Sequence, residues 1–211
     1  MPKQNPLVSA PEQVPDEPPD LTDDLLGHDA VLTGPSEPGG AVDVHRPSQR
    51  PWPRVTVPEH ALVTVAGLHG GAGTSTVTAL FGGAASDAGV GFPVAGGWKR
   101  PLPTLNVVMV ARTHAAGLAA AEEFARQWEA GELMESRLLG LILVDDGPKL
   151  YDSQRRAVKR LLKMTPVGAH IPWVETWRIQ SPDLDNLPRR LRKIVERFIS
   201  QAHQGYERNE S

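Results

Sequence analysis

The stretch from Ala61 to Thr76 constrains the fold of this chain more than any other. Residues 61–66 form an apolar run, which predicts a buried strand, and residues 67–73 are rich in glycine. A helix is expected to follow at once. Strand, glycine loop and helix N-terminus together present free backbone N–H groups and the helix dipole to one anion. The candidate phosphate contacts are His69, Gly70, Gly71, Ala72, Gly73, Thr74, Ser75 and Thr76.

The charge of a standard phosphate loop is missing from this stretch. Such a loop ends Gly-Lys-Ser/Thr, and here the lysine position holds Thr74. The helix dipole contributes only about 0.3–2 kcal/mol, so we expect weak nucleotide binding or none. Ser75 still stands where a hydroxyl would bind Mg²⁺, which leaves Mg-ATP as the alternative ligand. A third interpretation is a plain strand-to-helix turn with Thr74 or Ser75 as N-cap.

Composition narrows the class of protein. The chain has 211 residues and no cysteine, which excludes disulfides, thiolate metal sites and cysteine nucleophiles. It has no apolar run near the ~20 residues of a membrane helix and no secretory h-region. A soluble, cytoplasmic protein is therefore expected.

Residues 1–54 are predicted to form a disordered, Pro-rich acidic tail. They hold 11 of the 20 prolines, and their 4 basic and 9 acidic side chains give a net charge of -5. Leu21, Leu25 and Leu32 are spaced for one face of a short helix, which would dock on a partner or on the basic end of the chain. The alternative is a few apolar residues in a linker. Trp52 is expected to pack on the edge of the domain.

Residues 55–203 are predicted to form one α/β domain, with residues 204–211 as a disordered end. Apolar runs predict strands at Leu105–Ala111, Leu138–Val144 and Val167–Ile171, besides the first. Helices are expected at Ser75–Ala88, Ala115–Glu129 (N-capped by Thr113), 151–164 and 187–201. Gly89–Pro103 is predicted as a loop with a short edge strand near Val90–Val94. This alternation favours a mostly parallel sheet flanked by helices.

In a parallel sheet, ligands bind beyond the carboxyl ends of the strands. That edge is expected to gather the glycine loop, residues 112–114, Asp145-Asp146 and Pro172-Trp173. Asp145 either holds Mg²⁺ through water at the end of its strand or belongs to a solvated Asp-Asp-Gly-Pro turn. His69 and His114 lie at adjacent strand ends, but their spacing to other ligands predicts no metal site.

The loop resembles the deviant Walker A loop of the ParA/MinD partition and septum-site ATPases, whose pattern is Lys-Gly-Gly-x-Gly-Lys-Thr/Ser-Thr. The later elements, including the Leu-Gly-Leu-Ile-Leu-Val strand, follow that family's order over about residues 61–200. The chain looks like a shortened, degenerate and uncharacterised actinobacterial-type member. The resemblance implies a truncated P-loop NTPase-like fold and a role in plasmid or chromosome partition, conjugal transfer or cell-pole positioning.

The chain departs from that family at its reactive positions. His69 and Thr74 replace the two lysines, and Leu68 replaces the first glycine of the general pattern. The stretch before Leu105 is too short for the two strands that carry the family's catalytic aspartates, neither of which is found. Hydrolysis by that family's mechanism is therefore not expected.

Three functions remain open. The first is a protein-binding or scaffold module that works with a protein partner or as a homodimer, with weak or no nucleotide binding. The second is an active nucleotide-dependent P-loop enzyme, an ATPase or a related ligase or kinase. The third is a DNA-associated protein, because residues 149–197 carry 12 basic and 5 acidic side chains, a net charge of +7. Helices 151–164 and 187–201 would then contact DNA, or they are solvated faces that hold the acidic tail.

Overall fold

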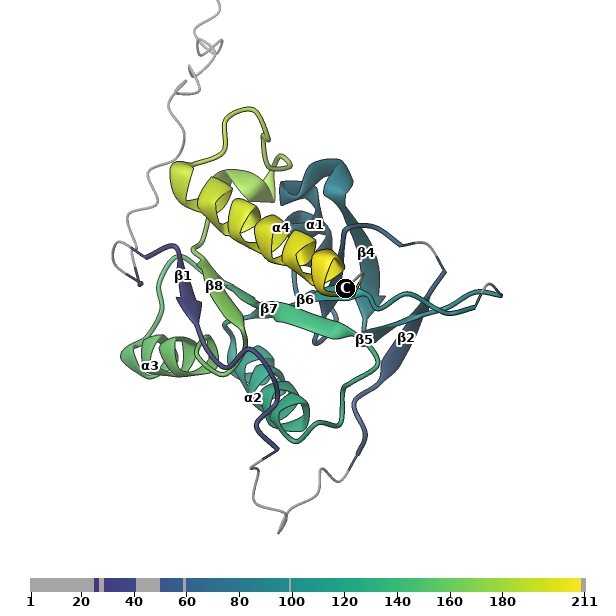
Figure 1. The fold of residues 1–211 in the computed structure, drawn as a ribbon. Helices are drawn as coiled ribbons and strands as arrows, with labels where there is room; N and C mark the ends of the chain where they lie inside the picture. The colour runs from purple at the N-terminus through teal and green to yellow at the C-terminus, as the bar shows by residue number, and fades with distance from the viewer. Residues whose placement is uncertain (1–24, 27–28, 41–49, 59, 99, 210–211) are drawn as a thin grey trace, which may run out of the picture.

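The computed structural model describes residues 25–26, 29–40, 50–58, 60–98 and 100–209, with only the backbone for residues 205–209. Its main sheet has the strand order β1-β8-β7-β6-β3-β4 (Figure 1), in which every neighbouring pair is parallel except β1 and β8. The strands are β1 Val31–Thr33, β3 Val63–Gly67, β4 Ala85–Val90, β6 Asn106–Arg112, β7 Arg137–Val144 and β8 Val167–Ile171. The predicted α/β class with a mostly parallel sheet is confirmed.

Helices cover both faces of this sheet. They are α1 Thr74–Leu80, α2 Ala115–Glu129, α3 Asp152–Leu161 and α4 Arg189–Asn209, with short 3-10 turns η1 Gly82–Ala84 and η2 Glu175–Arg178. Alternate residues of β6 divide between the two layers: Met109 packs with Phe124 of α2, and Val108 packs with Phe198 of α4. Both halves of the core are therefore apolar, which explains the uninterrupted apolar runs of the central strands.

The predicted helix Ser75–Ala88 is wrong beyond its first turns. Helix α1 ends at Leu80, Gly82 has a positive φ of 56°, and the chain then forms β4 beside β3. The glycine pair Gly82-Gly83 and the Ser86-Asp87 that follow it have low helix propensity. Pairing β4 with the buried strand β3 outweighs that weak local preference.

The other central elements agree closely with the expectation. Helix α2 has the predicted bounds, and Gly131, with a φ of 77°, follows its end. Its N-cap, however, is His114, whose Nδ1 accepts from the N–H of Gly117 at 3.0 Å; Thr113 is not the cap. The expected edge strand near residues 90–94 is β5, Phe92–Ala95, which pairs with β2, Arg54–Val57, in a second, two-stranded sheet.

Part of the predicted tail belongs to the folded domain. Val31 pairs with Ala169 across β1 and β8, so Leu32 lies in a strand and not on a helix face. Leu25 is buried in the core, whereas Leu21 falls outside the described residues. The predicted boundary at residue 54 is therefore too late. A period-based interpretation missed β1 because three residues carry too little pattern.

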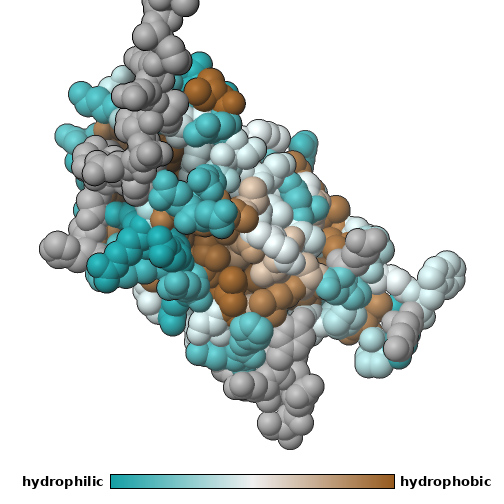
Figure 2. Space-filling view, turned by 90° about the horizontal axis from the view of Figure 1, so that it is seen from above, coloured by the Kyte–Doolittle hydropathy of each residue, from teal (hydrophilic) through white to brown (hydrophobic). Residues whose placement is uncertain are grey.

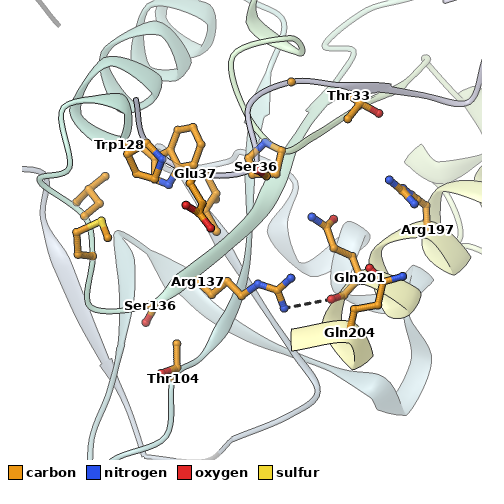
Figure 3. A pocket seen from close by; sticks show the side chains of 16 residues that line it. Thr33, Ser36, Glu37, Thr104, Trp128, Ser136, Arg137, Arg197, Gln201 and Gln204 are labelled. Carbon is orange, nitrogen blue, oxygen red and sulfur yellow. Dashed lines mark hydrogen bonds between the residues drawn. The ribbon is translucent and has the colours of Figure 1, made fainter. Parts of the chain in front are cut away.

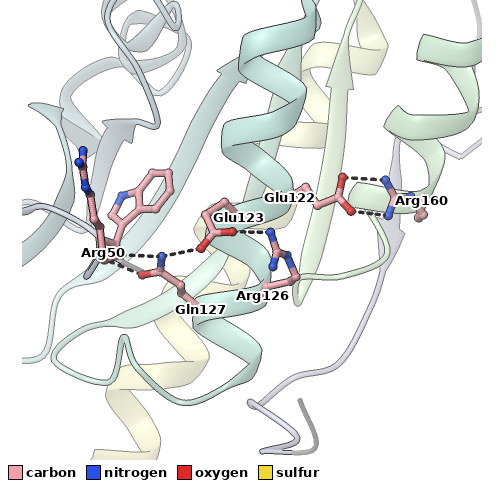
Figure 4. Close-up of polar contacts among 7 residues, drawn as sticks. Arg50, Glu122, Glu123, Arg126, Gln127 and Arg160 are labelled. Atoms are coloured by element: carbon pink, nitrogen blue, oxygen red, sulfur yellow. Dashed lines mark hydrogen bonds and ion pairs between the residues drawn. The ribbon is translucent and has the colours of Figure 1, made fainter. Parts of the chain in front are cut away.

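Trp52 packs on the edge of the domain as predicted. Its ring meets Phe124 edge-on at a centroid distance of 5.5 Å. Its backbone N–H donates to Oε1 of the buried Gln127 at 2.9 Å, and Gln127 Nε2 donates to the carbonyl of Arg50 (Figure 4). These contacts join the entering chain to α2.

The C-terminal helix is longer than predicted. Helix α4 continues through residues 204–209, which were expected to be disordered, and residues 210–211 lie outside the described part. Within the described residues, no helix has the length and apolar character that crossing a membrane requires.

Candidate functional site at the carboxyl edge of the sheet

The glycine loop between β3 and α1 has the backbone of a tight turn. Gly71 and Gly73 have φ values of 73° and 93°, which favour glycine, and Gly73 is the N-cap of α1. The N-cap prediction for Thr74 or Ser75 is wrong, since no side chain caps this helix. Ala72 is buried, and Gly70 and Gly71 are exposed at the loop tip.

His69 ties the loop to β6. Its Nε2 accepts from the backbone N–H of Arg112 at 3.1 Å, and its Nδ1 lies 2.9 Å from the carbonyl of Gly70. A backbone N–H can only donate and a carbonyl can only accept, so this pattern fixes a neutral ring with the proton on Nδ1. The His69 ring also lies against His114, with centroids 4.9 Å apart. His69 therefore stands at the position of a lysine, but it supplies hydrogen bonds that join the loop to β6 and no positive charge.

A cation reaches the loop from a neighbouring strand. Nη1 of Arg112, at the end of β6, donates to the carbonyl of Asp145 at 2.6 Å. The guanidinium passes so close to Gly73 that a Cβ there would lie 3.4 Å from Nη2. The positive charge that Thr74 cannot supply is thus present beside the loop, although one of its donors is already engaged.

Ser75 is paired with an acid that sequence reasoning missed. Its Oγ donates to Oδ2 of Asp87 at 2.8 Å, and Oδ1 of Asp87 accepts from the N–H of Gly89. Asp87 was assigned to the last turn of the predicted helix Ser75–Ala88 and not considered as a site residue. Its place in β4, opposite Val65, brings it to Ser75. The signal was present in the Gly82-Gly83 pair, which is unfavourable in a helix interior.

Asp145 is buried, whereas Asp146 and Pro148 of the same turn are exposed. Its Oδ1 lies 2.9 Å from Nε2 of His170, and the Thr113 hydroxyl lies 3.1 Å from the same oxygen and 2.9 Å from Oδ1 of the exposed Asp146. The Thr113 hydroxyl has one hydrogen, so it donates to one of the two carboxylates at a time. This network joins the ends of β6, β7 and β8 through Oδ1 of Asp145.

The expected edge therefore forms, with the glycine loop, residues 112–114 and Asp145-Asp146 in mutual contact. Trp173 takes another role, since its Nε1 donates to Oε2 of Glu175 at 2.7 Å. That hydrogen bond, together with Arg178, lowers the pKa of Glu175. Trp177 packs against the core layer that contains α4. Among the described residues, no group of three or more His, Asp or Glu side chains is placed to hold a metal.

One basic helix, α3, is partly neutralised by an acid on a neighbouring element. Arg160 of α3 makes a two-pronged contact with Glu122 of α2, with both N–O distances near 2.9–3.0 Å (Figure 4). On α4, the side chains of Arg189, Arg192, Lys193 and Arg197 are exposed, whereas Arg190 is half-buried. Both helices therefore present exposed basic side chains, which fits a solvated face as well as a DNA-binding one.

The model of a family described as "Family of unknown function (DUF6668)" matches residues 61–195, which run from the strand before the glycine loop into α4. No curated protein and no solved structure matches the chain.

Proposed function

The chain belongs to the family of unknown function DUF6668, and we propose that it is a protein-binding or scaffold module built on a degenerate P-loop-like domain. In this role the glycine loop binds nucleotide weakly or not at all. Contacts with a protein partner or a second copy of the chain carry the function. The resemblance of the loop to ParA/MinD ATPases supports a role in partition or conjugal transfer.

The observation that carries this proposal is the exposure of Trp98. Its side chain is wholly exposed, and the connection between β5 and β6 that holds it projects away from the sheet (Figure 1). Burying such a large apolar side chain is worth about 1.5–3 kcal/mol or more, and tryptophan is enriched among the residues that anchor interfaces. A partner that covers Trp98 would gain this free energy.

A second apolar surface supports the same function. Figure 2, in which the molecule of Figure 1 is seen from its upper side, shows hydrophobic surface between hydrophilic patches. The connection before α4 contributes two exposed large hydrophobic residues, Ile179 at 87% and Leu184 at 48% exposure. Exposed apolar patches rimmed by polar residues commonly mark interaction sites.

The arrangement of the polar groups in the loop region supports the proposal that nucleotide binds weakly or not at all. Thr74 brings no charge, His69 is held neutral, and the buried Asp145 is engaged by His170. Phosphate transfer in P-loop enzymes depends on a lysine at the β- and γ-phosphates. Its absence removes the strongest contact to those phosphates.

One observation favours the alternative, an active nucleotide-dependent enzyme. P-loop enzymes hold Mg²⁺ between the loop Ser/Thr and an acid, and the Ser75–Asp87 pair at 2.8 Å has that composition. Arg112 beside Gly73 would then replace the missing lysine. Isothermal titration of the purified chain with Mg-ATP, Mg-GTP and Mg-ADP separates the two functions. Micromolar affinity with measurable turnover would establish the enzyme and overturn the scaffold.

The protein-binding role is tested by site-specific cross-linking in the native cell. A photo-reactive amino acid replaces Trp98 in one variant and the exposed Arg156 of α3 in a matched control. We expect a discrete adduct from position 98 and none from position 156. Sedimentation of the wild type and Trp98→Ser over a concentration series shows whether the partner is a second copy. Identical adducts from both positions, with no self-association, would contradict the proposal.

A further inference from the structure

A cavity of about 480 Å³ lies at the edge of the sheet opposite the glycine loop. It opens at the amino ends of the strands, since Thr104 precedes β6, Arg137 begins β7 and Pro166 precedes β8. The segment that follows β1 closes one side (Figure 3). A volume of this size is in the range of small-molecule sites, about 300–1,000 Å³.

The wall after β1 is held firmly in place. The N–H of Gly34 donates to the carbonyl of Pro166, and a Cβ on Gly34 would lie 2.3 Å from the carbonyl oxygen of Lys163. Further along, the N–H of Gly39 donates to Oε1 of Glu129 at the end of α2. Glycine therefore permits this segment to lie directly on the domain, so that residues predicted as tail form a preformed wall.

The floor of the cavity is apolar. Trp128 of α2, Leu133 and Leu138 line it and are almost wholly buried, while Met134 is exposed at the rim. These side chains come from α2, the connection after it and β7, so the core fixes their positions. They suit an apolar ligand body.

The opposite wall is cationic and rich in amides. Figure 3 shows Arg137 at the centre, with Arg197, Gln201 and Gln204 projecting from α4. Nη1 of Arg137 donates to the carbonyl of Gln201 at 3.1 Å, which braces it against the helix. Arg197 is exposed and has no hydrogen bond or ion pair within the described part of the chain.

The charges of the cavity favour an anion. Two arginines and one carboxylate, that of the exposed Glu37, leave an excess of one positive charge. An arginine that projects into a cavity without a partner is suited to a planar carboxylate, which it binds through two parallel N–H groups. The neighbouring amides of Gln201 and Gln204 add further donors.

We propose that this cavity binds a small organic monocarboxylate, with its carboxylate on Arg197 and its apolar body over Trp128 and Leu133. This amino-edge site is separate from the glycine loop and does not depend on nucleotide binding there. The segment after β1 completes the site, which links the N-terminal region of the chain to ligand binding.

The test is isothermal titration of the full chain with octanoate and 2-naphthoate, and with the neutral amides of the same acids. We expect at least one acid to bind with a Kd below about 1 mM, the weak end of the affinity scale, and its amide to bind at least about tenfold more weakly. Arg197→Gln should weaken binding of the acid by about tenfold and leave the amide unchanged. Arg156→Gln, which removes the same charge from the exposed face of α3, should change neither.

Because Arg197 is an exposed surface residue, we expect its substitution to leave the fold intact. Thermal unfolding of each variant checks this. Failure of both acids to bind the wild type overturns the proposal. So does an affinity for the acid that Arg197→Gln leaves unaltered. Acid binding that Arg156→Gln weakens as much as Arg197→Gln does would show general attraction of anions to a basic surface, and would also overturn it.

Discussion

Nε2 of His170 lies 2.9 Å from Oδ1 of Asp145, and both side chains are buried at the carboxyl edge of the sheet. The pair joins the end of β8 to the residue that follows β7, and Thr113 ties it to β6. A buried acid is costly unless other groups pair with it. The network therefore makes Asp145 a structural residue at the place where the sequence suggested either a metal ligand or a solvated turn.

Replacing Asp145 should strongly destabilise the fold. Asp145→Ala leaves Nε2 of the buried His170 without its hydrogen-bond partner, and leaving a buried polar group unsatisfied costs about 1–3 kcal/mol. Asp146→Ala is the control, because Asp146 is exposed and shares the same Thr113 hydroxyl; we expect a loss below about 1 kcal/mol. Urea unfolding followed by tryptophan fluorescence measures both. Equal losses in the two variants would contradict the structural role of the buried pair.

Gly117 should tolerate no side chain, although it lies in a helix. A Cβ at this position would lie 2.1 Å from the carbonyl oxygen of Arg112 and 2.9 Å from Nε2 of His69. Alanine improves helix propensity by about 1 kcal/mol, but displacing the end of β6 costs about 1–3 kcal/mol or more. We expect Gly117→Ala to lower the free energy of unfolding and to loosen the contact between His69 and Arg112.

The control for that substitution is Gly83→Ala. Nothing lies within 4 Å of a Cβ on Gly83, so its effect should stay within about 0.5 kcal/mol. Chemical denaturation gives both free energies, and the NMR shifts of the His69 ring report the local contact. Gly117→Ala as stable as Gly83→Ala would show that α2 can move away from β6 without loss.

The sequence predicts the central sheet better than its edges. Strands β6 and β7 are long apolar runs whose pattern depends only on burial, and α2 combines strong helix formers with a glycine stop. Strand β1 is short and β4 is polar in part, so only their pairing with buried neighbours reveals them. The glycine loop was located correctly for the same reason as β3, because turn residues follow an apolar run.

The contacts of the candidate site could not be predicted in the same way. Nothing in the spacing of Ser75 and Asp87 identifies them as a pair once the segment between them is assigned to a helix. The cavity at the amino edge depends on residues 33–38, which have the composition of a tail. That segment is held in place by the pairing of β1 with β8 and by the close approach of Gly34 to the backbone of Lys163, which precedes β8.

A lysine placed in the glycine loop should restore some affinity for phosphate. The backbone turn with positive φ at Gly71 and Gly73 is retained, and Thr74→Lys adds the missing charge at the start of α1. We expect Mg-ATP to bind at least about tenfold more tightly than to the wild type. Thr76→Lys, which adds the same charge two residues later, should gain less. Titration with a fluorescent ATP analogue measures both, and equal gains would show a general charge effect without phosphate-loop geometry.

The contact between Glu122 and Arg160 should make stability depend on acid pH. The Arg160 hydrogen bond lowers the pKa of Glu122 from its usual 4.5, so the folded state favours the charged carboxylate. A carboxyl whose pKa is lowered on folding stabilises the fold above its unfolded pKa, and this contribution is lost as the pH falls through the lower, folded pKa.

The side chains of Arg160 and Glu122 are 55% and 40% exposed, and solvent screening limits the contribution of the pair to about 0.5 kcal/mol. Glu122→Gln should therefore lower the free energy of unfolding by about that amount at pH 7, and the difference from the wild type should vanish as the pH falls below 4.5. Urea unfolding in a series of buffers measures this difference, and repeating it in 1 M NaCl, where the Debye length is about 3 Å, should reduce it. A difference that stays constant down to acid pH would mean that packing of the Glu122 side chain, not its charge, joins α2 to α3.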